Sequence, residues 1–408
     1  MKKDLYLNNF SSNLRNSFNW LMGIIMVGAH QFNFPLIPYL LIIFLGNKKF
    51  SNFLNNKNNI LILILLSLSI FSLTNRGYPL FEAINVSRFF FGIPFLYLFL
   101  NSKLFSELKY PIIIAFIGWN IIELIFVIVT GEPPFYISNF FIQNFGNDES
   151  IIRTRVGANN ETFRLLGPAL NSSINGTISG CILIASIFNK EIIFPDSKVS
   201  KLQEKLISIS TAIIFFFSAS GTGYGVFSLL LINKFIWPTL KDLIKNLRIK
   251  VVSLTLLAFG LIASIQALIL IPTVFQKLEI RYILYVTREK RDLILQFLNF
   301  NDVGDILFGI DYNPLGSLFT NGDFIILSLI SALGIVFLVF LIFIMLKIYP
   351  ANRIYFFALL ISSLHYGTLF SVTGQIICSV VFASKNKITS SSKFNYQTIN
   401  RYSENKSL

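Results

Sequence analysis

The sequence predicts an all-α fold, a polytopic transmembrane helical bundle of about 12 spans. Hydrophobic residues make up 54% of the 408 residues and charged residues only 13%, which leaves too little polar surface for a soluble globule of this length. The apolar residues also fall in runs of roughly 11 to 23, and the longer of these runs have the length with which an α-helix crosses the hydrocarbon layer. The composition therefore predicts an integral membrane protein.

The apolar runs locate the spans along the chain. The expected spans are residues 18–29, 34–46, 60–73, 89–100, 110–130, 170–188, 206–218, 224–237, 251–271, 324–346, 354–370 and 372–382. Several runs are shorter than a perpendicular crossing needs, so the first pair and the last pair can alternatively be re-entrant hairpins among the other helices. The first run leads directly into the second without a small-residue cleavage site, and we expect it to be retained.

The spans define one transmembrane domain, residues 1–383. Residues 384–408 are rich in Ser, Asn and Lys, and we expect them to form a disordered cytoplasmic tail. Two long loops, residues 131–169 and 272–323, fall on the same side of the membrane in this arrangement. A polytopic membrane protein seldom keeps loops of this size without using them, so we expect the functional site on that side.

Lysine and arginine set the orientation, because cytoplasmic loops collect them. Most of the 34 lysines and arginines fall in alternate loops and near the two ends of the chain, which predicts cytoplasmic N- and C-termini. The net charge of +14 is then a topology signal, and a nucleic-acid partner loses its support.

Arginines on the outer face are the candidate contacts for an anion. A planar guanidinium suits the oxygens of a phosphate, whether in a lipid headgroup or in a lipid-linked diphosphate. The candidates are Arg153, Arg155, Arg164, Arg281, Arg288 and Arg291. Ordinary headgroup contact remains the alternative for Arg153 and Arg155, whereas Arg164 stands beside a Gly-Pro turn at the mouth of a span, which favours function.

The second long loop begins with a segment of helical character, residues 274–300. Arg288 and Asp292 have the spacing of an i, i+4 ion pair, whereas Arg291 has no acid four residues on and is the better ligand candidate. The glycine-bearing segment that follows contains Asp311 and, near its end, Asp323. These are candidate general bases for a sugar hydroxyl, with solvated loop acids as the alternative.

Two features within the spans also attract notice. Glu123 is an acid deep in an apolar run, and we expect it to face a polar interior, because burying it unpaired would be costly. The junction SASGTG, residues 218–223, exposes amides and hydroxyls, although tight packing of a helical hairpin explains it equally well. Arg88 is a further candidate anion contact or headgroup anchor.

No metal site and no cofactor are expected. His30 and His365 are isolated in apolar surroundings, where a packing role is favoured over metal binding. Cys181 and Cys378 both lie within apolar runs and suggest neither a disulfide framework nor a thiolate site.

Taken together, these motifs resemble the O-antigen polymerase (Wzy-type) family, within the O-antigen ligase and polymerase superfamily. The resemblance rests on the Arg-x-x-Gly of Arg164 to Gly167, on SASGTG, on the arginine helix leading to FGIDYNP, and on the span that begins DFIILSLISALGIVFL. The chain departs from the family at two points. The junction lacks the usual arginine, and Asn-Gly-Asp at 321–323 stands where many relatives have His-Asn.

The resemblance implies a glycosyltransferase at the periplasmic face of the bacterial inner (plasma) membrane. It would join oligosaccharide repeat units carried on undecaprenyl diphosphate into O-antigen, the polysaccharide of lipopolysaccharide, or a related surface polysaccharide. Arg164, Arg288 and Arg291 would bind the diphosphate, and Asp311 or Asp323 would assist the acceptor hydroxyl. The implied partners are the lipid-linked glycan, membrane lipid, and flippase and chain-length regulator proteins.

Two other functions stay open. A ligase of the same superfamily would transfer finished glycan to an acceptor, and a transporter or flippase would move lipid-linked sugar. A transporter is expected to show paired repeats and short loops on both sides, whereas this sequence predicts two long loops on one side.

Reporter fusions test the orientation. Fusions after Asn56, Lys201 and Lys245 should report the cytoplasm, and fusions after Asn147 and Asp302 the periplasm, because the basic residues divide in that way. A cytoplasmic signal at Asp302 would put the second loop on the wrong side for the predicted site.

Overall fold

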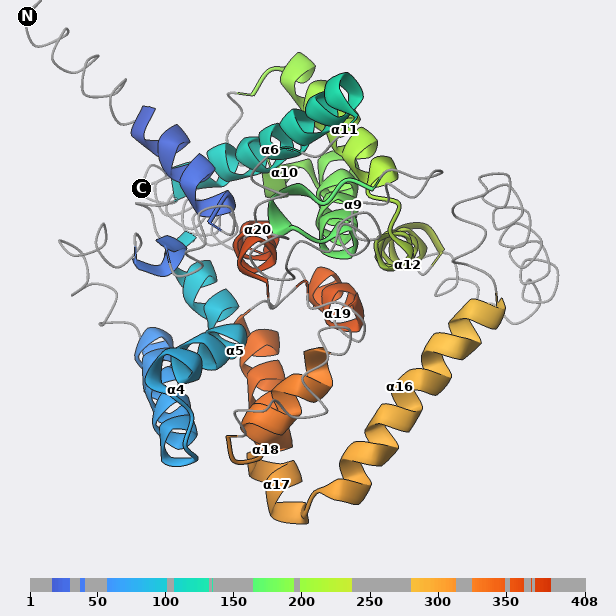
Figure 1. Ribbon diagram of the computed structural model, residues 1–408. Helices are drawn as coiled ribbons and strands as arrows, with labels where there is room; N and C mark the ends of the chain where they lie inside the picture. Colours follow the sequence, from blue (N-terminus) through green and yellow to red (C-terminus); the bar gives the residue numbers. More distant parts are fainter. Residues whose placement is uncertain are drawn as a thin grey trace, which may run out of the picture.

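The computed structural model (Figure 1) describes residues 17–29, 37–40, 57–100, 106–131, 134, 164–193, 199–236, 280–312, 325–348, 353–362, 368 and 371–382. The ordered elements in these ranges are helices, and no strand occurs among them. The prediction of an all-α fold is therefore confirmed. The predicted span 251–271 and the predicted tail, 384–408, lie outside the described residues.

The helices follow one another along the chain. They are α4 (Lys57–Asn75), α5 (Leu80–Leu100), η2 (Ser106–Leu108), α6 (Lys109–Thr130), η3 (Gly167–Ala169), α9 (Ser172–Phe188), α10 (Lys190–Ile193), α11 (Lys201–Phe217), α12 (Gly221–Leu231), the π-helical turn η4 (Ile232–Ile236), α16 (Ile280–Phe300), α17 (Val303–Phe308), α18 (Ile325–Ile348), α19 (Arg353–Ser362) and α20 (Val372–Phe382). The helix expected over residues 274–300 is present as α16 from residue 280 onward, and residues 274–279 lie outside the described residues.

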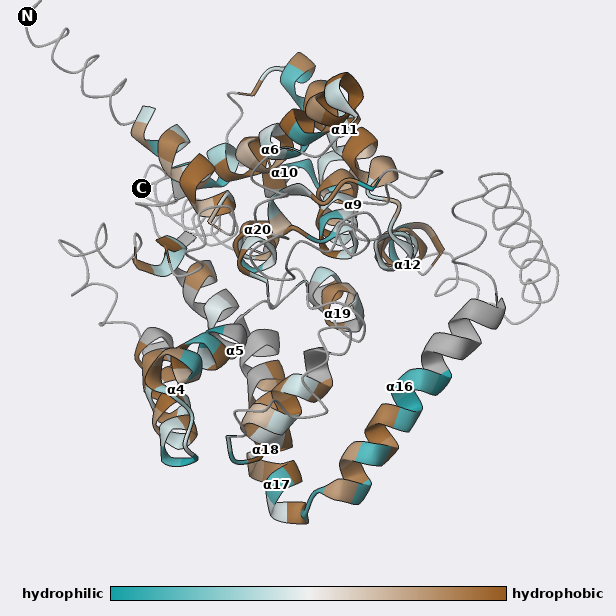
Figure 2. Cartoon of the chain, in the orientation of Figure 1, coloured by the Kyte–Doolittle hydropathy of each residue, from teal (hydrophilic) through white to brown (hydrophobic). Residues whose placement is uncertain are grey.

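One helix in the described part of the chain, α6, is long and apolar enough to cross a membrane by length and composition. Shorter apolar helices cover Ser17–Val27, Leu63–Asn75, Ser172–Phe188, Leu327–Phe340 and Val372–Val381. Large apolar side chains are exposed along α4, α6 and α11, and Figure 2 shows the apolar character of these helices.

Helix α9 is the centre of the upper part of the fold in Figure 1, with α11, α12, α10 and α20 packed around it. Every residue of α9 from Ile174 to Ser186 is buried. Small residues let its neighbours approach closely, since a Cβ added at Gly223 of α12 would lie 2.7 Å from the carbonyl carbon of Gly176. Helix packing is therefore one reason for the small residues of the SASGTG junction.

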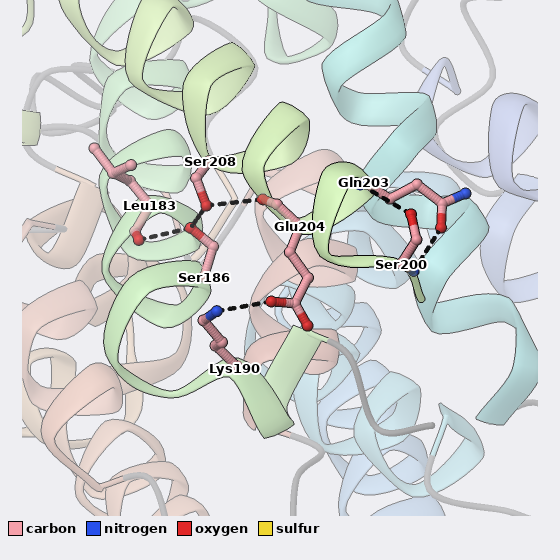
Figure 3. Close-up of polar contacts among 7 residues, drawn as sticks. All are labelled: Leu183, Ser186, Lys190, Ser200, Gln203, Glu204 and Ser208. Carbon is pink, nitrogen blue, oxygen red and sulfur yellow. Dashed lines mark hydrogen bonds and ion pairs between the residues drawn. The ribbon is translucent and has the colours of Figure 1, made fainter. Parts of the chain in front are cut away.

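Polar contacts join the other end of α9 to α11 (Figure 3). The hydroxyl of Ser208 donates to that of Ser186 over 3.0 Å, and Lys190 forms an ion pair with Glu204 at 2.7 Å. Helix α11 begins with a capping box, in which Ser200 and Gln203 each accept the other's backbone N–H. These contacts lie at the opposite end of α9 from the Arg164 segment.

The lower part of Figure 1 is built around α18, whose helix is interrupted at Gly334 (φ 81°). The chain that leaves α17 fits against this break, because Ile310 N–H donates to the carbonyl of Ser331 over 2.7 Å. Phe297 near the end of α16 packs on Leu327 of α18. The rest of α16 stands apart from the central helices in Figure 1.

Candidate functional site

The structure brings together two of the motifs singled out in the sequence. The backbone N–H of Leu165 donates to the carbonyl of Phe217 over 2.9 Å, so the segment that begins with Arg164 lies against the end of α11. The SASGTG junction follows Phe217 directly. Arg164 itself is half-buried and is an electrostatic neighbour of Tyr224, in the first turn of α12.

Glu123 of α6 binds the backbone of the same segment through two hydrogen bonds. One of its carboxyl oxygens accepts the N–H of Leu166 over 2.9 Å, and the other accepts the N–H of Gly167 over 2.6 Å. The Glu123 side chain has no exposed surface. The expectation that Glu123 faces a polar interior is therefore confirmed, and its partners among the described residues are two backbone amides.

Next to Glu123, hydrogen bonds between the side chains of Asn120, Asn175 and Ser218 extend towards the SASGTG junction. Asn175 of α9 donates to Asn120 Oδ1 over 2.6 Å and to the hydroxyl of Ser218 over 3.1 Å. Asn120 in turn donates to the carbonyl of Phe116 in its own helix over 2.9 Å. All three polar side chains of this chain are fully buried, so it links α6, α9 and α11 inside the bundle.

Asn120 and Asn175 were not recognised as site residues from the sequence. The available signal was their position: each is an amide within an apolar run, and Asn120 lies one helical turn before Glu123. Their mutual contact spans 55 residues, a separation that periodicity alone does not bridge.

The N-termini of α9 and α12 meet beside Arg164. Asn171 caps α9 by accepting the N–H groups of Ser173 and Ile174, and Ser220 caps α12 by accepting that of Gly223. The Ser220 hydroxyl also lies 3.5 Å from the carbonyl of Ser173, which places the two first turns against each other. Helix N-termini carry partial positive charge, so these two first turns beside the Arg164 segment are a candidate site for an anion.

Helix α20 covers this site from a third side. The hydroxyl of Thr373 lies 3.3 Å from the carbonyl of Pro168 and equally far from that of Val27. Gln375 donates to the carbonyl of Arg88 over 3.1 Å and accepts the hydroxyl of Tyr39. Arg88 is only 8% exposed, which places it inside the bundle rather than at its surface.

A second polar cluster joins the α4–α5 turn and the start of α5 to α18 and to the segment that follows α17. Arg76 donates to the carbonyl of Ala332 over 2.7 Å, beside the break in α18, and Tyr312 donates to Glu82 over 3.2 Å. Burial lowers the pKa of the Arg76 guanidinium, while the charges of nearby groups, including Asp311, act in the opposite direction. Asp311 is exposed at the edge of this cluster. Arg76 therefore serves the fold, and sequence reasoning did not identify it.

The arginines of α16 are arranged differently from the sequence-based expectation. The spacing allowed an i, i+4 pair of Arg288 with Asp292, but Asp292 instead forms an ion pair with its neighbour Arg291 at 2.9 Å. Arg291, preferred as a ligand because it has no acid four residues on, is thus the arginine that has an acidic partner. Both partners of this pair are at least half exposed, and such surface pairs contribute little stability. Arg288 is exposed. Arg281 lies on α16, but its side chain is outside the description.

The predicted site residues do not all lie near one another. Arg288 and Arg291 belong to α16, and Asp311 follows α17, which packs on α18. Both helices stand apart from α9 and α12 in Figure 1. The remaining predicted residues, Arg153, Arg155 and Asp323, lie outside the described residues.

Within the described ranges, no three His, Cys, Asp or Glu side chains form a group that could hold a metal ion. Cys181 and Cys378 are both free and buried. In comparisons with protein-family models, curated proteins and solved structures, nothing matches this chain.

Gly167 offers a test of how tightly the Arg164 segment is held. It has a left-handed backbone (φ 62°), and an added Cβ would lie 2.6 Å from Asn120 Oδ1 and closer still to Asn175 Oδ1. Gly167→Ala should therefore lower the melting temperature in detergent through both a backbone cost of about 1–2 kcal/mol and overpacking of about 1–3 kcal/mol.

Gly131→Ala is the matched control for that variant. Gly131 is also left-handed (φ 74°), but nothing lies within 4 Å of an added Cβ. It should show the backbone cost alone. Equal melting temperatures for the two variants would mean that the amide chain does not fill the space over Gly167.

Proposed function

We propose that the protein is a multi-pass membrane glycosyltransferase, a polymerase that joins undecaprenyl-diphosphate-linked oligosaccharide repeat units into O-antigen or a related surface polysaccharide. The observation that carries the proposal is the meeting of Arg164 with the N-termini of α9 and α12. The sequence resemblance to the O-antigen polymerase family supplies the choice of substrate.

The chemistry needs a group that stabilises a leaving diphosphate. In the transfer, the bond between the anomeric carbon of the growing chain and the diphosphate oxygen breaks, and a bond to an acceptor hydroxyl forms. Negative charge then develops on the diphosphate, where Arg164 and the two helix N-termini stabilise it without having to reorganise. The acceptor proton passes to a base. Asp311 follows α17, apart from Arg164, so of the two candidates Asp323, which lies outside the described residues, is the one that the proposal retains.

The α16 arginines have a secondary place in the proposal. Arg288 and Arg291 are exposed and basic, so they suit the approach of a polyanionic lipid headgroup. Arg153, Arg155 and Arg281 remain proposed contacts of the same kind. Arg164 differs from Arg288 and Arg291 in that it is half-buried, next to Tyr224 of α12, whereas they are exposed.

The membrane arrangement is also part of the proposal. It has about 12 spans, cytoplasmic termini and the Arg164 end of α9 at the periplasmic face of the inner membrane. The exposed apolar side chains of α4, α6 and α11 support contact with lipid. The opposite end of α9 carries Lys190, and α11 begins there with Lys201, which agrees with a cytoplasmic side rich in lysine.

A deletion strain tests polymerase against ligase. Removal of the gene should leave surface glycan that is capped with single repeat units, because transfer of one unit to the final acceptor does not need polymerisation. Loss of all glycan from the acceptor would support the ligase instead. A normal glycan profile would contradict both, and lipid flipping by the purified protein in vesicles would then favour the transporter.

Complementation of that strain tests the role of Arg164. Arg164→Lys should lose most of the polymer, a fall in rate of roughly tenfold to a hundredfold, because lysine keeps the charge but lacks the planar fork. Arg353→Lys makes the same change at the start of α19, where Tyr355 donates to Asn189 at the opposite end of α9, and should leave polymer length unchanged. Wild-type polymer length for Arg164→Lys at matched protein level would contradict the assignment.

A further inference from the structure

We infer that Glu123 is a positioning residue for Arg164: its carboxyl group holds the chain after Arg164 in the place that the diphosphate contact requires. This inference rests on the proposed function, because it gives Glu123 its role through the proposed ligand of Arg164. From the sequence, Glu123 was expected only to face a polar interior, and the inference now gives this residue a function.

Three successive amides after Arg164 are all held by other helices. Leu165 donates to the carbonyl of Phe217 over 2.9 Å, Leu166 to one oxygen of Glu123 over 2.9 Å, and Gly167 to its other oxygen over 2.6 Å. All three backbone N–H groups of this stretch are therefore paired, so the stretch cannot slide along its neighbours without breaking a hydrogen bond. Arg164 is the first residue before this fixed stretch, so its Cα is placed relative to both α6 and α11.

Glu123 does not itself contact a reacting group. It has no exposed surface, and each of its oxygens already accepts a backbone N–H. It therefore acts through the backbone rather than on the substrate. The Asn120–Asn175–Ser218 chain adjoins it and leaves little room for the Leu166–Gly167 peptide to move, since Asn120 and Asn175 both crowd Gly167.

Glutamine is the informative replacement for Glu123. It has the same shape but one oxygen only, so its NH₂ group would point at one of the two donating amides. One hydrogen bond is lost and two donors then face each other in a buried place. The segment should move away from this contact, and Arg164 with it.

The test is a double-mutant cycle on purified protein, with undecaprenyl diphosphate in detergent as the probe and its Kd as the readout. We expect Arg164→Gln and Glu123→Gln each to weaken binding by about tenfold. We expect the double variant to bind no more weakly than Arg164→Gln alone, because Glu123 acts only through Arg164. If Glu123 acted independently of Arg164, the fold-change in Kd of the double variant would be the product of the two single fold-changes.

Ser186→Ala is the matched control. Ser186 is also a buried polar residue in a hydrogen bond between helices, but it lies at the far end of α9. Its loss should lower the melting temperature without changing the Kd. Should Glu123→Gln fail to fold, Glu123→Asp replaces it in the cycle, because aspartate keeps both oxygens on a shorter stem and should give a smaller but equally non-additive loss.

The outcomes separate the inference from the proposed function. An unchanged Kd for Arg164→Gln would overturn the diphosphate role of Arg164, and with it the proposed site. Two results would overturn the positioning role alone, given a raised Kd for Arg164→Gln. One is an unchanged Kd for the Glu123 variant, and the other is a double variant whose fold-change in Kd is the product of the two single ones.

Discussion

The architecture around Arg164 depends on pairing three buried amides, those of Leu165, Leu166 and Gly167. An unpaired N–H among apolar helices costs several kcal/mol, about as much as a helix can gain from a few packed side chains. Glu123 and the carbonyl of Phe217 remove this cost only when α6 and α11 lie on opposite sides of the segment. The pairing of these amides therefore fixes α6, α11 and the segment 165–167 relative to one another.

Helix α9 connects the Arg164 segment to the core of the bundle, because its two halves have different composition. Its first half, SSINGTISG, is small and polar, which lets α12 approach and gives Asn175 its contacts with Asn120 and Ser218. Its second half, CILIASIF, is almost wholly apolar and packs in the main core. The polar half brings two helix N-termini to Arg164, while the apolar half holds α9 in place.

Composition and pattern predicted the all-α fold, the helix that became α16, and the need of Glu123 for polar partners. They also singled out Arg164 and the SASGTG junction, because both break an apolar pattern. They could not predict which groups meet. The partners of Asn175, the insertion of Arg76 beside the break in α18, and the pairing of Asp292 with Arg291 all depend on tertiary packing or on rotamers, which a repeat of 3.6 residues does not encode.

Arg164 and the α16 arginines differ in how much side-chain rotamer freedom they lose when they bind a ligand. An exposed arginine loses up to about 2 kcal/mol of rotamer freedom when it is immobilised, so Arg288 and Arg291 gain less from each contact with an anion. Arg164 is half-buried beside Tyr224 of α12, so part of its rotamer freedom is already lost before a ligand arrives. Preorganised charge acts on the transition state with the least reorganisation. In the proposed reaction, catalysis therefore belongs with the fixed arginine, and the exposed helix is suited to the capture of substrate.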